Sequence, residues 1–161
     1  MVANPDTEDL QVELARRHRA AAFTVIGFII LALVLLVLAY FAHKSIFRPA
    51  DPAITMGLWI TILVFGLGAF IFRRTKFAPL RLKDIVAVRG PSGLLKTLQG
   101  TTIECAAIGG AITLMGFIIT IRTGDWTDML RAAGVALVVL IYCYPFRSSW
   151  ERALIQFSRE L

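Results

Sequence analysis

AAAFTVIGFIILALVLLVLAYFA, residues 20–42, is an unbroken apolar stretch that decides the fold class of this chain. It exceeds the about 20 residues that a helix needs to cross the hydrocarbon core of a bilayer. Three further apolar runs follow it, at residues 53–72, 102–121 and 129–144. The sequence therefore predicts an all-α integral membrane protein with four transmembrane helices.

The composition agrees with this class. The 161 residues are 57% hydrophobic with a mean hydropathy of +0.72, whereas soluble domains are about 45–50% apolar. The net charge of +6 lies beside the apolar runs, where it acts as a topology signal, so we expect no nucleic-acid partner. The first run is too long for the core of a cleaved signal peptide and follows several acidic residues, which predicts a retained helix.

One membrane domain, residues 1–161, is expected. Its predicted parts are a helical extension at 7–19, spans at about 20–43, 53–72, 102–121 and 129–146, a loop at 73–101 and a tail at 147–161. Two short links, 44–52 and 122–128, predict two antiparallel hairpins joined by the amphipathic loop. Gly124 is expected to form the second turn, and Thr127 or Asp128 to cap the fourth helix.

The distribution of Lys and Arg predicts the orientation. Thirteen lie in the N-terminal segment, the loop and the tail, and only four lie on the other side. The positive-inside rule then places both termini and the loop in the cytoplasm, in a bacterial-type inner membrane. Trp126 and Tyr40 are expected at the outer boundary, and Tyr142 and Trp150 at the inner one.

The loop at 73–101 combines basic and apolar residues. Such a segment is expected to form short interfacial helices that rest on an anionic inner leaflet, with a turn at Arg89–Gly93. The predicted lipid or partner surface comprises Arg73, Arg74, Arg81, Lys83 and Arg89. The extension places Leu10 and Leu14 on one side of a helix; these side chains are interpreted as solvated, with contact to a partner as the alternative.

Glu104 is the only acidic residue inside a predicted span. An ionisable group in the bilayer suggests proton or cation transport, with Thr113 and Thr120 lining the same helix. However, Glu104 is only the third residue of its span, so it can pair with a nearby basic residue or reach water. The structural interpretation is preferred, and a candidate ion or proton site at Glu104 is the alternative.

The third span is rich in small residues. Ala106, Gly109, Gly110 and Gly116 are expected to let neighbouring helices approach closely. The first span, by contrast, carries large aliphatic residues that suit lipid or an apolar partner.

Few reactive groups remain for catalysis. The only cysteines, Cys105 and Cys143, fall at similar depth near the inner face and are interpreted as inert packing. His18 and His43 lie at opposite ends of the first helix, which disfavours haem ligation. The sequence contains no catalytic triad, paired carboxylates or nucleotide-binding loop, so we predict neither an enzyme nor a cofactor or metal site.

The sequence thus favours a non-catalytic membrane protein that serves as a structural or accessory subunit. Its expected partners are anionic lipids of the inner leaflet and other membrane subunits or further copies of the chain. A small oligomeric channel that uses Glu104 and a membrane-surface adaptor that uses residues 73–101 are the alternatives.

Overall fold

The computed structural model describes residues 5–46 and 51–158, and these residues form five helices. The helices are α1 (Pro5–Ile46), α2 (Pro52–Lys76), α3 (Pro79–Thr123), α4 (Trp126–Cys143) and α5 (Arg147–Ser158). Four of them, α1 to α4, contain segments long and apolar enough to cross a membrane. The protein is therefore an all-helical, multi-pass membrane protein.

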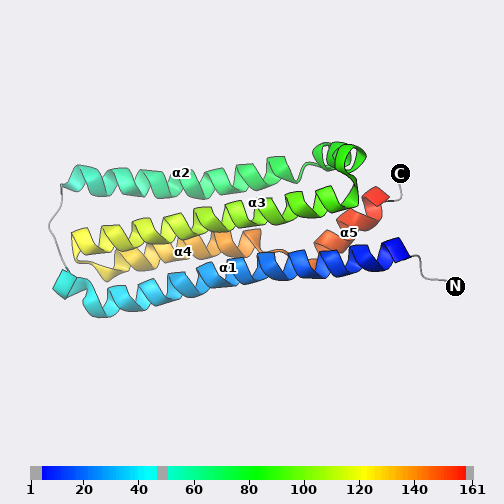
Figure 1. The fold of residues 1–161 in the computed structure, drawn as a ribbon. Coiled ribbons are helices and arrows are strands. Elements are labelled where there is room, and N and C mark those ends of the chain that lie inside the picture. The colour runs from blue at the N-terminus through cyan, green and yellow to red at the C-terminus, as the bar shows by residue number, and fades with distance from the viewer. Residues whose placement is uncertain (1–4, 47–50, 159–161) are drawn as a thin grey trace.

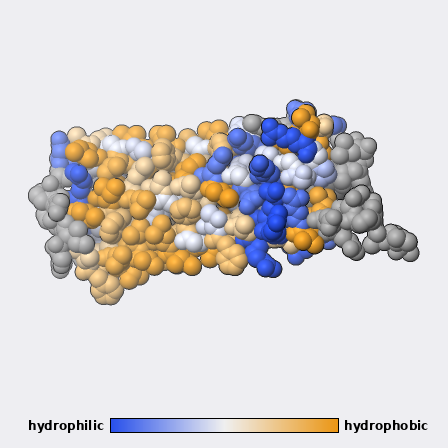
Figure 2. Space-filling model, viewed as in Figure 1, coloured by the Kyte–Doolittle hydropathy of each residue, from blue (hydrophilic) through white to orange (hydrophobic). Residues whose placement is uncertain are grey.

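The helices lie side by side, and successive long helices run in opposite directions (Figure 1). The start of α1 and the end of α5 lie at the same end of the bundle, which we call the terminal end; the opposite end is the distal end. The central pair, α3 and α4, separates α1 from α2 (Figure 1). Figure 2 shows an apolar surface over most of the bundle and a hydrophilic band towards the terminal end.

Two different sets of buried residues cover the two sides of the α3–α4 pair. On one side, Ile62 and Ala69 of α2 pack with Ile112, Ile119 and their neighbours on α3 and α4. On the other side, α1 contributes Val25 to one cluster and Ala39 to another. None of these three clusters contains buried residues from both α1 and α2, so α3 and α4 link the outer helices.

Close contact in the bundle depends on glycines of α3. A Cβ at Gly109 would lie 2.8 Å from side-chain carbons of Leu140 on α4. A Cβ at Gly110 would overlap the ring of Phe28 on α1, and one at Gly116 would overlap Ala132 on α4. Ala106 is fully buried in the cluster with Val25 and Leu140. In helices surrounded by lipid, such close approach provides the van der Waals contact that holds them together.

The helices α1 and α3 are longer than a bilayer is thick. With 42 residues, α1 extends about 63 Å at a rise of about 1.5 Å per residue, whereas the hydrocarbon core is about 30 Å thick. The apolar run at 102–121 is only the second part of α3, which begins at Pro79. Most of the segment predicted as a loop is therefore helical and extends the bundle at its terminal end.

A separate hydrophobic cluster fills this extension. Leu14 of α1, Leu94, Leu95 and Leu98 of α3 and Trp150 of α5 are all buried in it. Leu10 packs against the same cluster. The interpretation of Leu10 and Leu14 as solvated is therefore wrong, because their partner is another part of the same chain. Trp150 is likewise buried rather than exposed at a membrane boundary.

Gly90 changes the direction of α3. Its φ of 67° and ψ of −177° interrupt the helix, and only glycine adopts this conformation readily. Pro91 follows directly, at a helix start where its missing N–H is not needed. The helix thus has two parts, residues 79–89 and 91–123, within the Arg89–Gly93 region where the sequence predicts a turn.

The turn between α3 and α4 is short. Gly124 ends α3 in the left-handed conformation, with φ 71°, as expected for a glycine C-cap. The N-cap of α4 is Asp125, whose carboxylate accepts a hydrogen bond from the Thr127 amide at 2.9 Å. The prediction of Thr127 or Asp128 as the cap is therefore wrong. Asp128 instead accepts a hydrogen bond of 2.8 Å from the Thr123 hydroxyl.

Gly116→Ala should test the close contact of α3 with α4. The added methyl group would overlap Ala132, so the free energy of unfolding is expected to fall by about 1–3 kcal/mol. Thermal melting in detergent, followed by circular dichroism, measures this. Gly68→Ala is the control, because its Cβ would meet nothing within 4 Å and would gain up to about 1 kcal/mol in helix propensity. Equal stability of the two variants would contradict the packing described above.

Candidate functional site

Arg73 of α2 lies among aromatic rings towards the terminal end of the bundle. Its guanidinium carbon is 4.7 Å from the ring centre of Tyr142 and 5.3 Å from that of Phe77. Tyr142 in turn stacks on Phe70 at 4.2 Å. The Nη1 atom of Arg73 is buried and has no hydrogen-bond partner within the described part of the chain. The aromatic faces supply the attraction that holds this cation at the α2–α4 contact.

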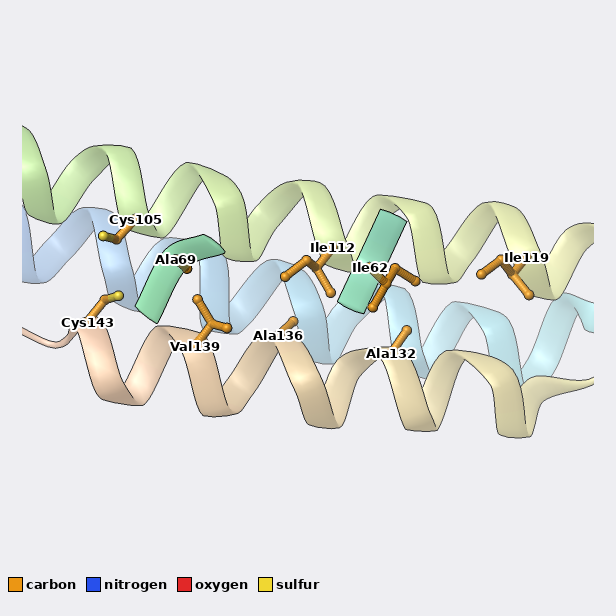
Figure 3. Packing of buried hydrophobic residues seen from close by; sticks show 9 residues of the cluster. All are labelled: Ile62, Ala69, Cys105, Ile112, Ile119, Ala132, Ala136, Val139 and Cys143. Atoms are coloured by element: carbon orange, nitrogen blue, oxygen red, sulfur yellow. The ribbon is translucent and has the colours of Figure 1, made fainter. Parts of the chain in front are cut away.

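Cys105 of α3 and Cys143 of α4 lie next to Arg73. Both cysteines are buried in the same hydrophobic cluster, and their side chains lie near each other and near the guanidinium. Figure 3 shows the two side chains opposite each other at one end of the α2–α3–α4 cluster. Three helices thus bring one cation and two thiols together at the terminal end of the apolar core.

This arrangement has limited chemical capacity. Within residues 5–46 and 51–158, no group of three or more His, Cys, Asp or Glu side chains is placed to hold a metal ion. The two thiols are enclosed by apolar neighbours such as Ala69 and Val139. The geometry is that of a packed contact, in which small polarizable side chains fill the space between helices.

Glu104 differs in exposure from Thr113 and Thr120 of the same helix. It is exposed on the outer face of the helix, and it forms no ion pair within 4.0 Å among the described residues. Thr113 and Thr120 are fully buried, and their hydroxyls donate to the carbonyls of Gly109 and Gly116 in their own helix. The structure therefore does not bring Glu104 together with these hydroxyls along one path.

The basic residues of the predicted lipid or partner surface have different environments. Arg74, Lys83 and Arg89 are exposed, Arg73 is half-buried as described, and the side chain of Arg81 lies outside the described residues. A shallow hollow of about 450 Å³ lies between the end of α2 and the first part of α3. Its lining residues are Lys76, Asp84, Ile85, Val88, Arg89 and Thr97.

A second hollow, which the sequence analysis did not identify, lies along α1. It measures about 290 Å³ and is lined by Ala15, His18, Arg19, Ala22, Phe23 and Ile26 together with Arg147 of α5. His18 is held in place because its Nε2 atom lies 2.7 Å from the Pro145 carbonyl and its ring meets Trp150 edge-on at 5.7 Å. The spacing of three and four residues along α1 was visible in the sequence, but the contribution of Arg147 was not.

Additional polar contacts connect the helices at this end. Arg17 of α1 forms an ion pair with Glu13 at 2.8 Å and donates a hydrogen bond of 3.1 Å to the Gln99 side chain on α3. At the distal end, Tyr40 meets Trp126 edge-on at 5.3 Å. Both ends of the bundle are thus fixed by contacts between side chains that are distant in the sequence.

Comparisons with protein families, with curated proteins and with solved structures gave no match to this chain.

Oxidation should join the two cysteines, because α3 and α4 hold their side chains opposite each other (Figure 3). Diamide is expected to accept two electrons and two protons from Cys105 and Cys143 of the folded protein, leaving a disulfide within one chain. Peptide mapping without reductant detects it. As a control, Cys105→Ser combined with Thr120→Cys puts the second thiol about 22 Å further along α3, where no disulfide should form. Disulfides in both proteins, or in neither, would contradict the predicted contact.

Proposed function

We propose that this chain is a non-catalytic integral membrane protein that serves as a structural or accessory subunit of a larger membrane assembly. We further propose that it lies in a bacterial-type inner membrane with both termini in the cytoplasm. The observation that carries this proposal is the division of its apolar surface. Small residues of α3 permit close contacts inside the bundle, while large aliphatic side chains are exposed on the outside of the first two helices.

The outer surfaces of α1 and α2 support a role in assembly. Leu33 and Val37 on α1 and Leu63 and Leu67 on α2 are about half to two thirds exposed. The apolar segments of these two helices are much less buried than those of α3 and α4. Lipid or the helices of another subunit would cover such surfaces, and their extent leaves room for partners on two sides of the bundle.

The packing inside the bundle favours a structural role over the role of an ion-conducting channel. Along α3, Thr102, Thr113 and Thr120 are buried, and each donates its hydroxyl to a carbonyl one turn earlier. Their polar groups are thus satisfied inside the helix. The neighbouring residues that fill the core are apolar, including Ile112, Ile119 and Val139. A conducting path usually presents polar groups to the ions that it carries.

The proposed orientation rests on charge. The hydrophilic band lies towards the terminal end (Figure 2), where Arg16, Arg74, Arg89 and Arg147 are exposed. Fewer basic residues belong to the distal end, where Arg122 and Arg131 are located. Lys and Arg close to transmembrane segments are retained on the cytoplasmic side, which supports the proposed placement of the termini.

Reporter fusions test this orientation. Alkaline phosphatase inserted after Gly124, in the turn between α3 and α4, should be active because that turn would lie outside the cytoplasm. The same reporter fused after Leu161 should be inactive, whereas a green fluorescent protein at that position should fluoresce. The reverse pattern in an otherwise stable fusion would rule out the proposed orientation.

Photo-crosslinking tests the assembly role in native membranes. A photoreactive phenylalanine analogue at Val37 or Leu63 is expected to form a discrete adduct with another membrane protein. The same analogue at Val138, an exposed position on α4, tests with the same chemistry whether a third outer surface also contacts a partner. Mass spectrometry of the adducts identifies the partner.

Purification in a mild detergent provides a second test of the accessory role. A subunit should co-purify with its partner, or with further copies of the chain, in a fixed ratio. A monodisperse monomer without crosslinks from either α1 or α2 would exclude the proposed role.

A further inference from the structure

The hollow along α1 changes from basic to apolar over three turns of one helix face. Ala15, His18, Ala22 and Ile26 recur at intervals of three and four residues, so they form a stripe, with Arg19 and Phe23 beside it. The basic side chains occupy the end of this stripe nearer the N-terminus, and Phe23 and Ile26 occupy the other end. Both apolar side chains are exposed, Phe23 to 67%.

The change in polarity coincides with the start of the first membrane-spanning segment. Arg16, Arg17 and Arg19 precede residue 20, and the uninterrupted apolar run begins there. In a bilayer the basic half of the hollow would therefore lie at the level of the lipid headgroups, and the apolar half at the level of the acyl chains.

The charges around the hollow favour an anion. Arg19 is exposed and has no ion-pair partner among the described residues, so its charge is not neutralised by the fold. Arg147 faces the hollow from α5 and pairs with Glu151 at 2.7 Å, with both side chains largely open to solvent. His18 uses Nε2 for the Pro145 carbonyl, which fixes the ring at the edge of the hollow. Two guanidinium groups from different helices thus flank one hollow.

We infer that this hollow is a binding site for an anionic glycerophospholipid. The phosphate binds between Arg19 and Arg147, and one acyl chain lies against Phe23 and Ile26 and continues along the exposed face of α1. Guanidinium groups donate paired hydrogen bonds to phosphate oxygens, and charge complementarity favours a headgroup with net negative charge over one that carries its own cation. The adjoining apolar stripe selects a lipid over a free phosphate ion. This inference requires the helices to span a bilayer, but it does not depend on an accessory role.

Native mass spectrometry of the detergent-solubilised full chain tests the site. With phosphatidylglycerol added, the protein should retain one lipid molecule, and it should bind phosphatidylcholine less tightly. Arg19→Gln combined with Arg147→Gln should weaken phosphatidylglycerol binding about tenfold or more and abolish the preference. An unchanged affinity in this variant would overturn the proposal.

A charge-matched control separates a defined site from general attraction. Arg16→Gln combined with Arg152→Gln removes the same charge from the same two helices, α1 and α5, at exposed positions outside this hollow. This variant should bind phosphatidylglycerol as the unaltered protein does. An equal loss in both double variants would show diffuse surface attraction and refute the site.

A competition experiment distinguishes a lipid-binding site from a site for free phosphate. A large excess of inorganic phosphate should leave the bound phosphatidylglycerol in place, and displacement would indicate a free-phosphate site instead. Thermal melting of each variant checks its folding. If the double variant does not fold, Arg19→Gln alone provides the test, because loss of this side chain breaks no ion pair among the described residues.

Discussion

The close approach of α3 to its neighbours is the constraint on which the rest of the bundle depends. Gly110 accommodates Phe28 of α1, while Gly109 and Gly116 accommodate Leu140 and Ala132 of α4. Lipid tails are as apolar as the side chains that they replace, so hydrophobic burial alone cannot hold helices together in a bilayer. Close van der Waals contact holds them together instead, and the small residues of α3 make that contact possible on two sides of one helix.

Hydropathy predicted the four apolar helices well because length and composition are the physical requirements for crossing a bilayer. The same signal could not show that α3 begins at Pro79, since polar helix beyond the membrane has no apolar run to mark it. The small residues of α3 and the two cysteines could be identified in the sequence as candidates for close contact. The proximity of Arg73 to those cysteines could not, because it depends on how α2 lies against α3 and α4.

The terminal end is a second packed region, distinct from the part of the bundle that can lie in a membrane. Leu14, Leu95 and Trp150 come from three segments that are distant in the sequence. In the sequence alone, Leu14 is consistent with a solvated position and Trp150 with a position at a membrane boundary. Their burial depends on how α1, α3 and α5 pack against one another. The packed cluster holds in place the helices that carry the exposed basic residues around it.

The separation of α1 from α2 by the α3–α4 pair (Figure 1) has a consequence for the synthesis of this membrane protein. The first two helices leave the ribosome before the helices against which they pack, and their buried clusters have no shared members. Neither of them can therefore reach its packing partners until α3 and α4 have entered the bilayer. Assembly of the bundle can be completed only after the C-terminal half has been inserted.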